Sequence, residues 1–107
     1  MEPHRLAEER SLTYHRAVAA RLEKDPAILA TARGRIRAWL VSDPAAFHAR
    51  AWEEVLSWPV PRIAAFLVDA SERARELRQS TPFAGAIPPR ERWRIWREVR
   101  AAGGTRP

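Results

Sequence analysis

The sequence predicts an all-α protein: an irregular bundle of five or six short helices with a C-terminal arm and helix. Three observations support this fold class. Alanine, arginine, leucine and glutamate dominate the composition, and all four residues favour helix. Apolar residues recur at intervals of three and four along most of the chain. No run of alternating apolar and polar residues is flanked by hairpin turns, so strands are not expected.

Residues 5–24 are expected to form the first helix. Its buried face is marked by apolar residues at i, i+4 and i+8, namely Tyr14, Val18 and Leu22. Asp25 and Pro26 then provide an N-cap and a proline at the first helical position, so a second helix runs to about residue 41. Its apolar positions follow the spacing of a core-facing helix: Leu29, Ala32, Ile36, Trp39 and Leu40.

The same cap chemistry recurs at Asp43 and Pro44, which predicts a third helix over residues 44–57. One face of this helix carries Phe47, Ala51, Val55 and Trp58. Pro59 and Pro61 must end it, because a proline disfavours the helical conformation of the residue before it.

A fourth helix is expected from Pro61 onward. Asp69 and Glu72 form a capping pattern, so a fifth helix would begin near Ala70. The apolar positions keep helical phase across Asp69, and one long helix over residues 61–79 is equally consistent with the sequence.

Residues 1–78 are therefore expected to form a helical body, and residues 79–107 an arm. The arm begins with a loop rich in proline and glycine and continues as a helix over residues 89–102, which Gly103 and Gly104 end. The predicted core of the body consists of Tyr14, Val18, Leu22, Leu29, Ile36, Trp39, Leu40, Phe47, Val55, Ile63, Phe66, Leu67 and Leu77.

The net charge of +6 is concentrated in the arm, where six arginines face two glutamates. A basic surface suits nucleic acid or an acidic groove on a protein. The chain has no cysteine, so a disulfide and a thiolate metal site are excluded. Its longest apolar run, residues 63–68, is far shorter than the ~20 residues of a membrane span. We expect a cytoplasmic protein that does not enter membranes.

Motifs for catalysis and cofactor binding are missing from the sequence. His4, His15 and His48 have no partner at i+4 and are expected to be solvated, so no metal site is predicted. No serine lies in a G-x-S-x-G elbow, and no glycine-rich loop could hold a phosphate. We expect a protein that is not an enzyme and has no cofactor.

The helix of the arm combines tryptophan with arginine, a mixture typical of contact surfaces. Phe83 and Ile87 precede this helix on a loop, and we expect that the loop cannot bury these two apolar side chains. The predicted partner-binding residues are Phe83, Ile87, Trp93, Arg94, Trp96 and Arg97. In an alternative interpretation, the tryptophans complete the core and the arginines are its solvated side.

A second alternative is a DNA-binding helix-turn-helix over residues 63–78. The pattern of small and apolar residues fits, but Val68 replaces the usual glycine of the turn and Asp69 occupies its buried position. In this interpretation the second helix reads the major groove. The nucleic-acid-binding residues would then be Ser71, Arg73, Arg75 and Arg78.

The C-terminal stretch also resembles a signature of small uncharacterised helical proteins of GC-rich bacteria, some of which are encoded beside toxins. The pattern is LRQ-S-x-PFAG-x-x-x-P-x-ERW-x-x-x-R. It is carried by Leu77, Arg78, Gln79, Ser80, Pro82, Phe83, Ala84, Gly85, Pro89, Glu91, Arg92, Trp93 and Arg97. The resemblance implies an antitoxin-like protein that neutralises a toxin encoded nearby.

Three functions remain open at this point. The first is a non-catalytic protein-binding module of the antitoxin type, which is the preferred interpretation. The second is a small helix-turn-helix-like DNA-binding regulator, and the third is an RNA-associated accessory protein that uses the basic arm. A homo-oligomer is compatible with each of them.

Overall fold

The computed structural model describes residues 2–104, which contain six helices and no strand. This confirms the all-α prediction. The helices are α1 (Pro3–Arg21), α2 (Pro26–Ser42), α3 (Phe47–Val55), α4 (Val60–Leu67), α5 (Glu72–Arg78) and α6 (Pro89–Gly104).

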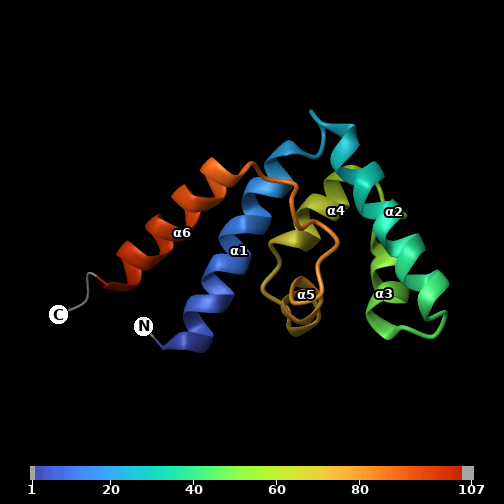
Figure 1. The fold of residues 1–107 in the computed structure, drawn as a ribbon, viewed down its shortest axis with the longest axis horizontal. Helices are drawn as coiled ribbons and strands as arrows, with labels where there is room; N and C mark the ends of the chain where they lie inside the picture. Colours follow the sequence, from blue (N-terminus) through green and yellow to red (C-terminus); the bar gives the residue numbers. More distant parts are fainter. Residues whose placement is uncertain (1, 105–107) are drawn as a thin grey trace.

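Helix α1 is the central element of the bundle. It contacts α4, α5 and α6, while α2 packs against α3 at the other end of the molecule (Figure 1). The molecule is elongated, with extents of 48 × 29 × 23 Å. Helix α6 and the pair formed by α2 and α3 therefore lie at opposite ends of the long axis.

The breaks between helices fall close to the predicted caps, with local differences. The Asp25 carboxylate accepts a hydrogen bond from the Ala27 amide, as its role of N-cap requires. Asp43 instead follows the end of α2, and α3 begins three residues later than Pro44, at Phe47. The Asp43 carboxylate accepts from the Ala45 amide and so stabilises the turn between the helices.

Residues 61–79 form two helices, which decides between the two sequence interpretations. The N-cap of α5 is Ser71, whose hydroxyl accepts a hydrogen bond from the Ala74 amide at 3.2 Å. Asp69 stabilises the turn that precedes α5, because its carboxylate accepts a hydrogen bond from the Ser71 amide at 3.0 Å. The short turn then lets α4 and α5 both pack on α1.

Most of the predicted core is buried or packed against it. Two members are wrong: Trp39 is 36% exposed and Phe47 is 72% exposed. Trp52, which was not predicted, is fully buried in their place. Its indole Nε1 donates a hydrogen bond to the Leu77 carbonyl at 3.1 Å, so this large side chain also joins α3 to α5.

The expectation that the loop after α5 cannot bury its apolar residues is wrong as well. Phe83 and Ile87 are each only 1% exposed. The Phe83 ring packs edge-on against Trp52, with 5.9 Å between ring centroids. The Tyr14 hydroxyl donates to the Phe83 carbonyl at 2.6 Å and so anchors the loop on α1.

The arm shares its core with the body. Ile95 and Val99 of α6 belong to the same hydrophobic cluster as Val18 and Leu22 of α1. An ion pair between Arg21 and Glu91 joins the same two helices at one end. Within residues 2–104 there is one continuous core that crosses the expected boundary at residue 79.

Candidate binding surfaces

The predicted partner-binding residues divide into two groups in the structure. Phe83 and Ile87 lie in the core and cannot contribute contact area to a partner in this conformation. Trp96 is half-buried at the junction of α6 with α1, whereas Trp93 is 60% exposed. Arg94 and Arg97 are exposed on α6. The candidate surface in the arm is therefore narrower than the sequence indicated.

The outer face of α6 carries a regular row of arginines. Arg90, Arg94, Arg97 and Arg100 follow one another at spacings of four, three and three residues, and all four are exposed. At about 100° per residue these positions fall within a sector of about 120°. Trp93 lies in the same sector, while the buried residues Ile95 and Val99 lie on the opposite side of the helix.

A small pocket adjoins this row where α6 meets α1. It has a volume of about 180 Å³ and is lined by Arg10, Trp93, Trp96, Arg97 and Arg100. The two indole rings meet edge to face, with 5.5 Å between their centroids. The pocket thus combines aromatic surface with three guanidinium groups.

Two arginines make cation–π contacts with the Trp96 ring. The guanidinium carbons of Arg10 and Arg92 lie 6.0 and 5.7 Å from its centroid. The Nε atoms of both arginines are buried, and within the described residues neither has a hydrogen-bond partner. Unpaired buried donors are uncommon in folded proteins, and here both guanidinium groups contact the Trp96 ring instead.

The residues of the helix-turn-helix alternative form hydrogen bonds or ion pairs within the protein. Arg78 is buried, and its Nη1 donates to the Leu67 carbonyl at 3.2 Å and the Asp69 carbonyl at 2.8 Å. Burial lowers the pKa of this guanidinium. Ser71 caps α5 through its hydroxyl. Arg78 and Ser71 thus have structural roles.

The other two residues of that alternative are exposed but paired. Arg73 contacts the Glu54 carboxylate at 3.4 Å, and Arg75 contacts the Glu8 carboxylate at 3.1 Å. Helix α5 has only seven residues. The arrangement therefore offers little free basic surface for reading a DNA groove.

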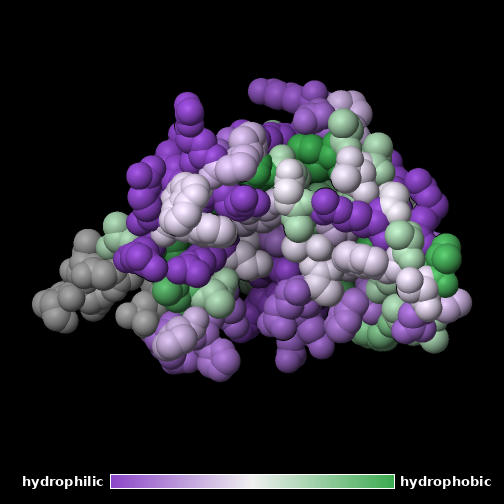
Figure 2. All heavy atoms as spheres, viewed as in Figure 1, coloured by the Kyte–Doolittle hydropathy of each residue, from purple (hydrophilic) through white to green (hydrophobic). Residues whose placement is uncertain are grey.

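An apolar groove that the sequence did not indicate lies at the opposite end of the molecule. Trp39 of α2 and Phe47 of α3 line it, and its volume is about 550 Å³. The remaining lining residues are Asp43, Ala46, His48, Ala49, Gln79, Ser80 and Thr81. In Figure 2, green residues are mixed with purple ones at the α2–α3 end, whereas most residues over α6 are purple or pale. We call this hollow the α2–α3 groove.

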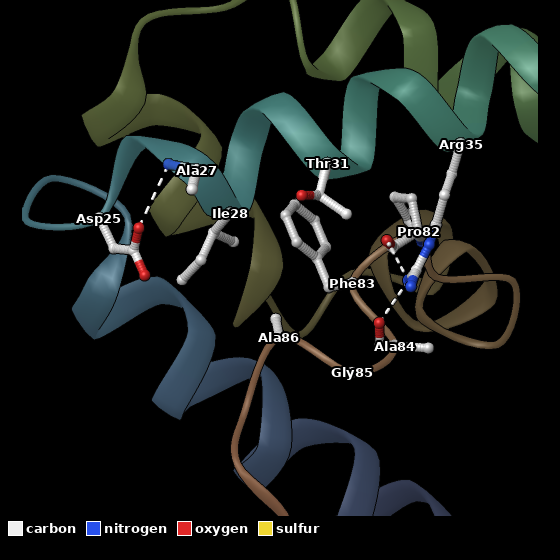
Figure 3. A pocket seen from close by; sticks show the side chains of 10 residues that line it. All are labelled: Asp25, Ala27, Ile28, Thr31, Arg35, Pro82, Phe83, Ala84, Gly85 and Ala86. Carbon is white, nitrogen blue, oxygen red and sulfur yellow. Dashed lines mark hydrogen bonds between the residues drawn. The ribbon is translucent and has the colours of Figure 1, made fainter.

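A further pocket, of about 190 Å³, lies between α2 and the loop that carries Phe83 (Figure 3). The Arg35 guanidinium reaches across it and donates to the carbonyls of Pro82 and Ala84. Gly85, with a φ of 80°, completes the turn beneath it. Since the polar groups of this pocket hold the loop in place, we assign it a structural role.

His15 was expected to be solvated, but it is buried beside the same loop. Its Nδ1 donates to the Ser11 carbonyl at 2.7 Å, so its Nε2 accepts from the Thr81 hydroxyl at 2.8 Å. Burial lowers the pKa of the imidazole to about 4, although the bond to Ser11 opposes the shift. The neutral imidazole is thus the form that the fold contains at neutral pH.

The hydrogen bond between the Thr81 hydroxyl and the His15 imidazole resembles that of an activated nucleophile. The surrounding hydrogen bonds instead indicate that it holds the loop in place. The Thr81 hydroxyl oxygen also accepts the Phe83 amide at 3.1 Å, which fixes the loop. In a catalytic triad a carboxylate accepts from the other ring nitrogen and stabilises the imidazolium. Here the acceptor is the Ser11 carbonyl, which is uncharged and does not stabilise it in that way. The arrangement joins the loop to α1.

No known protein family, curated protein or solved structure matches this chain. Within residues 2–104, no helix is long and apolar enough to cross a membrane. In the same residues, no three side chains of histidine, cysteine, aspartate or glutamate lie close enough together to hold a metal ion.

Proposed function

We propose that this protein is a non-catalytic binding module that docks a partner protein in the α2–α3 groove. One observation carries the proposal: Trp39 and Phe47 are 36% and 72% exposed beside a hollow of about 550 Å³. Exposed aromatic side chains that share a concave surface are typical of protein interfaces. Asp43 and His48 also line the hollow and supply polar groups, which protein interfaces contain alongside their aromatic residues.

The groove is a better candidate for protein docking than the arm. Phe83 and Ile87 of the arm are buried in the core, so the exposed outer face of α6 holds one tryptophan among arginines. The central part of a protein interface is depleted in charge and enriched in aromatic residues. The pair of Trp39 and Phe47 fits that description.

The more specific form of the proposal is an antitoxin-like protein that neutralises a toxin encoded nearby. Its support is the resemblance of residues 77–97 to small helical proteins, some of which are encoded beside toxins. A non-catalytic role agrees with the use of His15 and Thr81 as a clamp on the loop. A cytoplasmic location belongs to the same proposal.

The test is co-expression of the full chain with the product of the neighbouring gene, followed by co-purification and a growth assay. Phe47→Asp combined with Trp39→Ser should weaken the complex at least tenfold and abolish growth rescue. Trp93→Ser is the matched control, because it removes an exposed tryptophan outside the groove. Equal binding by the groove variant and the wild type would refute docking at this site.

Size-exclusion chromatography of the isolated protein separates a heterologous partner from a second copy of the chain. If the wild type elutes as a dimer and Phe47→Asp as a monomer, the groove is a contact between copies, and the proposal of a different partner is overturned. A monomeric wild type that binds the neighbouring product supports the proposal.

A further inference from the structure

We propose that the outer face of α6, together with Arg10 of α1, binds single-stranded nucleic acid. Phosphates would lie along the row of Arg90, Arg94, Arg97 and Arg100, and a base would stack on Trp93. This site is at the opposite end of the molecule from the α2–α3 groove and is independent of it.

The spacing of the arginine row suits an extended polyanion. Ten residues separate its ends, which at a rise of 1.5 Å per residue correspond to about 15 Å along the helix axis. A guanidinium therefore occurs about every 5 Å on one face. Arginine contacts phosphate oxygens in a bidentate manner, and a regular series of such contacts follows the backbone of a nucleic-acid strand.

The arginines of this row are largely free to bind. Within residues 2–104, Arg94 is the member of the row that forms an ion pair, with the Glu91 carboxylate at 3.9 Å. Glu91 also pairs with Arg21, on the side of α6 that faces α1. The sector holds no acidic residue, since Glu98 and Glu91 fall about 40° and 60° beyond its edge at Arg94.

Trp93 and the pocket beside it provide the contact with a base. The indole is 60% exposed, and it packs edge to face with the Trp96 ring. Arg10, Arg97 and Arg100 surround the same pocket, so an aromatic surface and anion-binding groups lie together. A nucleotide unit has both a flat aromatic ring and a phosphate, which matches this combination.

An acidic protein is a weaker match for this face. Apart from Trp93, the sector contributes only Ala101 as an apolar side chain, which gives no apolar centre for a protein interface. Duplex nucleic acid is also disfavoured, because its bases are stacked on one another and cannot stack on Trp93. RNA and DNA strands both carry the bases and phosphates that this site would contact, so both should bind.

The test is fluorescence anisotropy of the full chain with labelled dT12 and rU12 over a series of salt concentrations. Both strands should bind. If four phosphates are neutralised, log K should fall by about 3 per tenfold increase in salt, because single strands give about 0.7 per phosphate. Binding should also quench tryptophan fluorescence.

Two sets of variants localise the site. Arg94→Gln with Arg97→Gln should lower the slope by about 1.4, the contribution of two phosphates. The matched control is Arg37→Gln with Arg73→Gln, which removes the same charge from exposed positions on α2 and α5. It should leave the slope near the wild-type value. Trp93→Leu should weaken binding about tenfold without changing the slope, since stacking does not involve counterions.

Several results would overturn the inference. They are absence of binding to both oligonucleotides at 50 mM salt, equal losses in the control and α6 variants, and tighter binding of a 12-base-pair duplex or of poly-glutamate than of dT12. Phe47→Asp should retain oligonucleotide binding, and Trp93→Leu should retain the protein partner. Failure of this site is thereby distinguished from failure of the proposed groove.

Discussion

The Nε2 atom of His15 on α1 lies 2.8 Å from the Thr81 hydroxyl oxygen, in a loop 66 residues further along the chain. The other ring nitrogen, Nδ1, donates its proton to the Ser11 carbonyl. Nε2 can accept from Thr81 only when it carries no proton, so the imidazole must be neutral. This hydrogen bond, together with that from Tyr14 to the Phe83 carbonyl, holds the loop on α1.

Stability should therefore depend on pH through His15. Because burial lowers its pKa from 6.5 to about 4, the unfolded chain binds more protons than the native state between these values. Stability is fully present above pH 6.5 and falls as the pH drops toward 4, by an amount on the order of 3 kcal/mol. Urea denaturation at several pH values measures it.

A pair of histidine variants assigns that pH dependence. His15→Gln should remove the fall between pH 6.5 and 4, since glutamine does not titrate. His48→Gln, at an exposed position, should retain it. An unchanged pH profile in His15→Gln would show that other groups are responsible.

Two phenylalanines should differ strongly in their effect on stability. Phe83→Ala removes a buried ring between Trp52 and His15 and should cost about 3–5 kcal/mol. Phe47→Ala, at a 72% exposed position, should change the free energy of unfolding by less than about 0.5 kcal/mol. Chemical denaturation measures both, and similar losses would contradict the burial of the loop.

Arg78 should stabilise the turn between α4 and α5 rather than bind a ligand. Arg78→Met leaves the carbonyls of Leu67 and Asp69 without this donor and should cost about 1–3 kcal/mol. The exposed pair of Arg73 and Glu54 serves as a control, because Arg73→Ala should cost less than about 1 kcal/mol. Thermal denaturation monitored by circular dichroism would compare them.

Alanine should have opposite effects at two glycines. Gly85 has a φ of 80°, a conformation that costs an L-residue roughly 1–2 kcal/mol, so Gly85→Ala should destabilise the protein. At Gly34, inside α2, a Cβ would meet only the Arg37 guanidinium at 3.8 Å. Gly34→Ala should stabilise the protein by about 0.5–1 kcal/mol. Melting temperatures that move in the same direction would contradict this interpretation.

The α6 surface could be predicted only in part. The sequence predicted a contact surface that combines the tryptophans and arginines of the final helix, and Trp93, Arg94 and Arg97 are exposed there. It could not indicate Arg10, because that side chain comes from α1 and reaches Trp96 through tertiary packing. The α2–α3 groove was missed for the same reason, since it forms only when the loop at Thr81 lies beside Phe47.

The sequence by itself determined the helices and their approximate ends, because prolines, capping side chains and apolar spacing act within a few residues of one another. Only the tertiary structure decided which aromatic side chains are buried. The buried residues of α3 have the same helical spacing as the predicted face that contains Phe47; they are Ala49, Trp52, Val55 and Leu56. No local feature favoured Trp52 over Phe47 as the core residue. That choice, like the burial of His15 and Phe83, depends on contacts between segments far apart in the chain, which local spacing does not encode.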